Sequence, residues 1–194
     1  MKICFATNNE GKRKEIVAIT QGLYEIVNLK DIGCEEELPE NQDTLEGNSK
    51  EKASYVFQNY GINCFADDTG LEVYALQGEP GVYSARYAGP ACNAEDNMDL
   101  LLSKLSGIED RRAAFRTVIT LIVNGAVYQF EGKVDGSITQ KREGKAGFGY
   151  DPVFIPDGYK QTFASLSAEE KNKISHRGIA VRKLSEFLLT KYHA

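Results

Sequence analysis

Two adjacent carboxylates, Asp67 and Asp68, are the residues of this 194-residue chain whose type and spacing best suit metal chemistry. They follow the apolar pair Phe65-Ala66 and precede Thr69-Gly70, so we expect a strand that ends at the acidic pair, then a turn and a second strand. Neighbouring side chains of a strand point to opposite faces, so at least one aspartate should face a cleft. Paired aspartates at a strand end commonly hold Mg²⁺ and orient a water, and a solvated turn is the alternative.

The N-terminal segment has the pattern of a phosphate-binding turn. Ile3-Cys4-Phe5-Ala6 predicts a buried strand, and the residues from Lys14 to Ile19 have the spacing of an amphipathic helix. Between them lies Thr7-Asn8-Asn9-Glu10-Gly11-Lys12. The backbone N–H groups of such a turn, the positive end of the helix and a lysine suit an anion. The glycine and lysine spacing is not that of a Walker A loop, and a plain turn is the alternative.

Four further segments combine polar, glycine and aromatic residues. In order, they are Glu46–Ala53, Gly78–Gly89, Gly147–Phe154 and Ser175–Gly178. The first has a helical pattern, the second and third are punctuated by glycine, and the fourth opens the last predicted helix. Each has a purely structural alternative: a polar helix face, a turn, an aromatic core residue or a helix cap.

Taken together and in this order, the segments resemble the inosine triphosphate pyrophosphatase family. The matching pieces are Thr7-Asn8-Asn9-Glu10-Gly11-Lys12, Leu38-Pro39-Glu40, Glu46-x-Asn48-Ser49-x-x-Lys52-Ala53, Asp67-Asp68-Thr69-Gly70-Leu71, Pro80-Gly81-Val82-Tyr83-Ser84-Ala85-Arg86-Tyr87, Phe148-Gly149-Tyr150-Asp151 and Ser175-His176-Arg177-Gly178. They extend from residue 7 to residue 178, so the resemblance covers essentially the whole chain. It implies an α/β fold with a long mixed central sheet flanked by helices, in two lobes with an active-site cleft between them, within a single domain of residues 1–194.

The same resemblance implies Mg²⁺-dependent hydrolysis of non-canonical purine nucleoside triphosphates, namely ITP, dITP and XTP, to the monophosphate and pyrophosphate. Asp68 is then the general base that deprotonates the attacking water, and Glu40 and Asp68 are the metal ligands. Glu46 is either another metal ligand or a partner of Lys52. The resemblance also implies a homodimer.

Substrate contacts follow from the matching positions. Lys12, Lys52 and Lys171 are assigned to the triphosphate, and the turn that holds Thr7, Asn8, Asn9, Glu10 and Gly11 is expected to cradle its far end. Phe148 is expected to stack on the purine with support from Tyr150, and Asp151, His176 and Arg177 to read its edge, where a 6-oxo group replaces the amino group of adenine. Thr69, Arg86 and Gly149 complete the predicted substrate-binding residues.

Composition agrees with a globular enzyme. Hydrophobic residues make up 42% and charged residues 26% of the chain, and the net charge of −5 argues against a sequence-independent nucleic-acid binder. Its four cysteines show no C-x-x-C spacing, and no apolar run approaches the ~20 residues that a membrane helix needs. With no signal peptide apparent before Ile3, a reducing cytoplasm is the expected location.

The hydrophobic pattern predicts a mixed sheet with helices. Strands are expected at 2–6, 24–29, 62–66, 71–76, 113–123, 126–134 and 152–155, and helices at 12–20, 44–59, 94–105 and 176–191, with a helical turn at 168–172. Asn124-Gly125 predicts a β-hairpin turn, and Ser167 with Glu170 has the form of a capping box.

Two other functions stay open. One is a related pyrophosphatase that acts on modified pyrimidine nucleotides, and the other is a nucleotide-binding regulator without turnover. His176-Arg177 favours the purine enzyme over the first, and the presence of both Glu40 and Asp68 favours an enzyme over the second.

Overall fold

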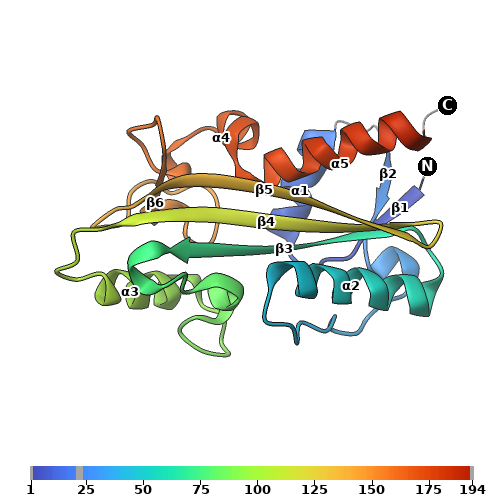
Figure 1. Cartoon of the computed structure of the whole chain (residues 1–194), viewed down its shortest axis with the longest axis horizontal. Helices are drawn as coiled ribbons and strands as arrows, with labels where there is room; N and C mark the ends of the chain where they lie inside the picture. The colour runs from blue at the N-terminus through green and yellow to red at the C-terminus, as the bar shows by residue number, and fades with distance from the viewer. Residues whose placement is uncertain (1, 21–23, 193–194) are drawn as a thin grey trace. The chain divides into compact units, whose positions relative to one another are not determined.

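The computed structural model describes residues 2–20 and 24–192 of the chain. Its strands are β1 (Lys2–Phe5), β2 (Glu25–Val27), β3 (Cys64–Val73), β4 (Arg112–Val123), β5 (Ala126–Ile138) and β6 (Phe154–Pro156), and its α helices are α1 (Glu10–Thr20), α2 (Leu45–Tyr60), α3 (Ala94–Lys104), α4 (Ala168–Ile174) and α5 (His176–Tyr192). The strands form one sheet in the order β2-β1-β3-β4-β5-β6, with helices beside it (Figure 1). β1 is parallel to β2 and β3, whereas β5 and β6 are antiparallel. The predicted mixed α/β fold is confirmed.

Contacts within the chain divide it into two compact units. Unit 1 holds Met1–Asp68, Thr117–Gly132 and Arg177–Ala194, and unit 2 holds Thr69–Arg116 and Lys133–His176. The residues of β3, β4 and β5 are shared between the units, so each unit consists of segments that are distant in the sequence. No single cut in the chain therefore separates them.

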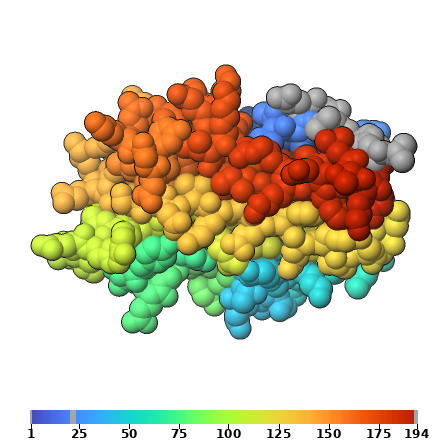
Figure 2. All heavy atoms as spheres, turned by 45° about the horizontal axis from the view of Figure 1, so that its top comes forward, coloured from blue at the N-terminus to red at the C-terminus, as the bar shows by residue number. Residues whose placement is uncertain are grey.

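Unit 1 has helices on both faces of its part of the sheet. Alternate residues of β1 and β3, such as Phe5 and Phe65, pack in one hydrophobic cluster with α1 and α5. The residues between them, such as Cys4 and Cys64, pack in another cluster with α2. Figure 2 shows α5, in red, on the surface along the hairpin of β4 and β5, and Lys183 of α5 donates to the carbonyl of Glu131 over 2.8 Å. Because both faces of the strands are covered, side-chain alternation decides which helices each strand residue meets.

Unit 2 has its own core around the remaining parts of β3, β4 and β5. Aromatic residues dominate it: the rings of Phe115 and Phe154 meet edge to face with centroids 4.7 Å apart, and Phe163 packs against both. Helix α3 contributes apolar residues such as Leu101 to the same cluster. The core holds the strand ends and the segment after β5 as one folded body.

The expectation of two strands around a turn at Thr69-Gly70 is wrong. The structure has one continuous strand, β3, from Cys64 to Val73, and Tyr74–Leu76 form a short 3-10 helix rather than strand. Gly70 is required because another backbone segment lies close to it, and not because the chain turns there. A β-carbon at this position would lie 2.6 Å from the carbonyl oxygen of Gly81. Ser84 holds that approach, because its hydroxyl accepts from the N–H of Leu71 and donates to the same carbonyl.

Two local predictions are confirmed. Asn124 and Gly125 join β4 to β5 with positive φ angles of 50° and 79°, as a type I′ hairpin requires. Ser167 and Glu170 form the capping box of α4. The helices and the other strands lie where the pattern predicts them, with ends that differ by a few residues; β5 continues to Ile138 and β6 is preceded by a 3-10 turn. Within residues 2–20 and 24–192, no helix is both long and apolar enough to cross a membrane.

We predict that Gly70→Ala lowers the free energy of unfolding by about 1–3 kcal/mol. The new methyl group meets a backbone carbonyl of the Gly81 turn, which a side-chain rotation cannot relieve. Urea unfolding followed by circular dichroism measures the change. An unchanged midpoint would mean that the turn moves away from β3 without loss.

Candidate active site

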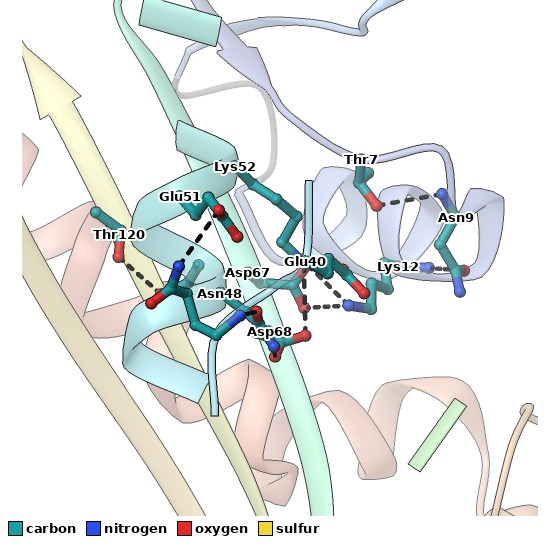
Figure 3. A network of polar contacts seen from close by, with 12 residues as sticks. Thr7, Asn9, Lys12, Glu40, Asn48, Glu51, Lys52, Asp67, Asp68 and Thr120 are labelled. Atoms are coloured by element: carbon teal, nitrogen blue, oxygen red, sulfur yellow. Dashed lines mark hydrogen bonds and ion pairs between the residues drawn. The ribbon is translucent and has the colours of Figure 1, made fainter. Parts of the chain in front are cut away.

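Consecutive residues of β3 place Asp67 and Asp68 on opposite faces of the sheet in unit 1, as the sequence predicts. Asp67 lies two residues after Phe65, so its side chain points to the same face of the sheet, toward α1 and α5. Asp68 lies two residues after Ala66, and its side chain points to the other face, toward α2. Both side chains are almost fully buried. Figure 3 shows the two carboxylates with the side chains of Lys12, Asn48 and Lys52 beside them. Each aspartate therefore has its own set of partners.

Asp67 is held by two cations. Lys12 Nζ lies 3.1 Å from each of its carboxylate oxygens, and Arg177 Nε lies 3.4 Å from Oδ2. Burial by itself would raise the pKa of Asp67, but Lys12, Arg177 and Lys52 outweigh it and hold the pKa well below its ordinary value. Asp67 therefore stays ionised and anchors both side chains.

Arg177 is enclosed between carboxylates of unit 1. Its side chain is 1% exposed, and Nη1 of its guanidinium also forms an ion pair with Glu15 of α1. Burial would lower the pKa of Arg177, but Asp67 and Glu15 reverse that effect and raise it. In this structure Arg177 joins α1, β3 and α5, and its contact with the edge of a base stays a prediction.

Asp68 has a different environment on the α2 side. Asn48 Nδ2 donates to Oδ2 over 3.1 Å, and Lys52 Nζ lies 3.4 Å from Oδ1. Burial and the charge of Glu40 raise the pKa of Asp68, although Lys52 and Lys12 oppose the shift. A carboxylate with a raised pKa accepts a proton more readily than an exposed aspartate, as a general base requires.

Glu40 and Asp68 converge on a single cationic group. Lys52 Nζ lies 2.5 Å from Glu40 Oε1 as well as 3.4 Å from Asp68 Oδ1 (Figure 3). Burial would lower the pKa of Lys52, but the two carboxylates raise it. The position between these oxygens therefore favours positive charge.

The residues present fit a magnesium ion at this position. Mg²⁺ binds through one or two carboxylates and keeps its other positions for water and phosphate oxygens, so Glu40 and Asp68 supply enough oxygen ligands. In the part of the chain that the structure describes, no group of three or more His, Cys, Asp or Glu side chains forms a metal cage. A magnesium ion held by Glu40 and Asp68 would take its other ligands from water and phosphate oxygens.

The two alternative roles of Glu46, as a metal ligand or as a partner of Lys52, stay predictions. The ion pairs of Lys52 run to Glu40 and Asp68. The backbone carbonyl of Glu46 accepts from the hydroxyl of Ser49 and from Gln129 Nε2, which fixes the start of α2 on the sheet.

The predicted phosphate turn leads from β1 into α1. The hydroxyl of Thr7 accepts from the N–H of Asn9 over 3.1 Å, and Asn9 Oδ1 accepts from the N–H of Lys12 over 3.1 Å. These bonds fix the turn at the positive end of the helix. Asn8, Asn9 and Glu10 are exposed and Gly11 is half-buried, so the turn lies at the surface with its lysine directed back to Asp67.

Unit 2 contains a second group of predicted residues. Asp151, 3% exposed, accepts from the backbone N–H of Phe148 over 2.8 Å and from Lys171 Nζ over 2.7 Å, both at Oδ2. Lys171 Nζ also lies 4.8 Å from the centre of the Phe148 ring. The structure therefore brings Lys171 together with residues predicted for the base, whereas Lys12 and Lys52 accompany Asp67 and Asp68. Gly147 leaves room for this carboxylate, because a β-carbon at that position would clash with Asp151 Oδ2.

The other predicted residues of unit 2 lie in or beside its core. Tyr150 is buried and donates its hydroxyl to the carbonyl of Ser84 over 2.9 Å. His176 is buried with its ring stacked on Phe115 at 4.6 Å. The guanidinium of Arg86 lies 5.3 Å from the ring of Tyr83. Thr69 and Gly149 are half-buried.

Sequence reasoning did not assign two residues that the structure brings to the acidic pair. In the sequence Asn48 is only one position of a matching motif, whereas in the structure it contacts Asp68 directly. Glu15 was placed only in the pattern of the first helix, and it pairs with Arg177 across 162 positions of sequence. Nothing local distinguishes Glu15 from a solvated helix residue, so only the fold reveals it.

Comparison of the sequence and the fold with known proteins identifies relatives of this chain. The sequence pattern of the Ham1 family matches residues 3–187. A dITP/XTP pyrophosphatase of Porphyromonas gingivalis is 53% identical over 189 residues, which are 97% of each chain, and one of Staphylococcus epidermidis is 43% identical over 98% of each. The solved structure of the Staphylococcus aureus Ham1 protein superimposes with a TM-score of 0.90 at 38% identity, and covers 98% of this chain and 100% of the other.

We predict that Arg177→Met lowers the free energy of unfolding by about 3–5 kcal/mol, because it leaves the buried carboxylates of Asp67 and Glu15 without the cation between them. Urea unfolding measures the loss. Arg182→Met is the matched control, since Arg182 is exposed on the same helix and should change stability by no more than about 0.5 kcal/mol. Equal effects of the two replacements would contradict a special role for the buried guanidinium.

Proposed function

The chain belongs to the Ham1 family, and we propose on that premise that it hydrolyses dITP, XTP and ITP to the nucleoside monophosphate and pyrophosphate with Mg²⁺. The relatives at 43–53% identity that carry the name dITP/XTP pyrophosphatase match this chain over nearly its whole length. Such an enzyme removes deaminated purines from the nucleotide pool. The observation that carries the proposal is the convergence of Glu40 and Asp68 on one cationic position.

The chemistry at that position divides between two carboxylates. Glu40 and Asp68 would hold the metal, which supplies charge neutralisation of the phosphates and a water that is easier to deprotonate. Asp68 also accepts the proton of the attacking water. Asn48 and Lys52 keep both oxygens of Asp68 in defined directions.

Lys12 and Lys52 are the cations of unit 1 that we assign to the triphosphate. Each is a compact charge on a flexible stem that can leave one oxygen for another, unlike the enclosed guanidinium of Arg177. The turn from Thr7 to Lys12 offers backbone N–H groups at the start of α1 for the same anion.

The base is assigned to residues of unit 2. Phe148 offers a half-exposed ring for stacking, and Asp151 holds it through its backbone N–H. Lys171 and His176 are donors that can meet a 6-oxo group and would oppose the amino group of adenine. We therefore assign Lys171 to recognition of the base, although the family resemblance assigned it to the triphosphate.

We expect the wild-type protein to convert dITP, XTP and ITP to monophosphate and pyrophosphate, and to convert ATP and dUTP much more slowly, since the predicted pocket opposes an amino group. Anion-exchange chromatography of the products measures both rates. EDTA should abolish turnover and added Mg²⁺ should restore it. Preferred hydrolysis of dUTP would identify a pyrimidine enzyme instead, and phosphate release with a diphosphate product would mean attack at the terminal phosphorus.

We predict that Asp68→Asn lowers kcat about 10²–10⁴-fold at nearly unchanged side-chain volume, because it removes both an anionic ligand and the proton acceptor. Asp43→Asn is the control: Asp43 is an exposed carboxylate in the segment that leads to α2, and kcat should stay within about threefold. Steady-state kinetics with dITP measure both variants. An Asp68 variant as active as the Asp43 variant would remove Asp68 from the mechanism.

A further inference from the structure

Asn48 is an additional side chain at the candidate metal position, and it is fully buried. It lies near the start of α2 and uses both ends of its amide. Its Nδ2 donates to Asp68 Oδ2 over 3.1 Å (Figure 3). Its Oδ1 accepts from the backbone N–H of Gln42 over 2.9 Å. One side chain therefore connects β3 to the segment that follows Glu40.

Glu40 needs such a connection because its own segment has no regular structure. Residues 37–42 lie outside helices and strands, so side chains of α2 hold them in place. Glu51 Oε2 accepts from the N–H of Asn41 over 2.8 Å, and Gly47 leaves room for Gln42, whose β-carbon would lie 2.6 Å from a β-carbon added there. Of the three α2 residues Gly47, Asn48 and Glu51, Asn48 also contacts Asp68.

An amide is the side chain that fits this position. It has a donor at one end and an acceptor at the other, as the carboxylate of Asp68 and the N–H of Gln42 require. An aspartate would oppose Asp68 with a second anion, and an alanine would leave both groups unbonded. The bond to Oδ2 also leaves Oδ1 of Asp68 directed to Lys52 and hence to Glu40.

We propose that Asn48 is a positioning residue that sets the direction of the Asp68 carboxylate and its spacing from Glu40. The proposal rests on the proposed function, because it assigns Asn48 to the same metal position. It acts through Asp68 and Glu40 and does not itself meet substrate or metal. Outer residues that orient metal ligands typically change metal affinity or activity by about 10- to 100-fold when they are replaced.

The test compares Asn48→Asp and Asn48→Ala with wild type. We expect kcat for dITP to fall roughly ten- to a hundredfold in each variant while KM stays within about threefold, because phosphate and base contacts are kept. The dissociation constant of Mn²⁺ from the free protein, measured by electron paramagnetic resonance, should rise roughly tenfold. Circular dichroism and thermal unfolding establish that each variant is folded.

Glu51→Gln is the matched control. It lies one turn further along α2, keeps an oxygen acceptor for the N–H of Asn41, and bonds to the same segment. It should leave kcat and the Mn²⁺ dissociation constant within about threefold of wild type.

Each result decides the proposal. If both Asn48 variants fold and keep the wild-type kcat and Mn²⁺ affinity, Asn48 does not position the carboxylates. If neither variant folds, Asn48 is a structural residue and the positioning role is also overturned. A wild-type protein that does not hydrolyse dITP contradicts the proposed function alone, because Mn²⁺ affinity still reports on Asn48.

Discussion

The alternation of side chains along β3 is the constraint on which the candidate site depends. Two consecutive aspartates in a strand must enter opposite faces, and in unit 1 both faces are covered by helices. Asp67 therefore meets α1 and α5, and Asp68 meets α2. A shift of one residue in the strand would exchange these environments, so the pairing of β3 with β1 fixes the chemistry of both aspartates.

The two environments give the aspartates different tasks. Asp67 is surrounded by cations that outweigh the cost of its burial, so it stays ionised and acts as an anchor. Burial and the neighbouring carboxylate of Glu40 raise the pKa of Asp68, although Lys52 opposes the shift. Pairs of titratable groups whose pKa values are driven apart are typical of catalytic sites. Local backbone geometry thus gives two adjacent aspartates opposite pKa shifts, which agrees with the proton-accepting role that we propose for Asp68.

The sequence predicted the parts of this arrangement that follow from local patterns. Strand alternation, the Asn124-Gly125 hairpin and the α4 capping box depend on neighbouring residues and were confirmed. The break at Thr69-Gly70 was wrong because the reason for Gly70 is the approach of a carbonyl 11 residues further on, which turn propensity does not encode.

The environment of Arg177 could not be predicted for a similar reason. Its partners Glu15 and Asp67 lie 162 and 110 positions away, and helix periodicity assigns Glu15 no special role. The resemblance to a family indicated that Arg177 belongs to the site, but not which groups surround it before substrate binds. Contacts between distant segments are the information that the fold adds to a motif.

The balance of charge around the acidic pair agrees with the metal site that we propose. Around the acidic pair, Glu15, Glu40, Asp67 and Asp68 face Lys12, Lys52 and Arg177, so four acids meet three bases. This group has no surplus of positive charge with which to neutralise a triphosphate, and the whole chain has a net charge of −5. If Lys52 turned to phosphate, the buried carboxylate of Asp68 would lose its ion-pair partner, which is costly. The divalent cation that we propose for Glu40 and Asp68 would meet both requirements, because it would compensate these carboxylates in place of Lys52 and would add positive charge for the phosphates.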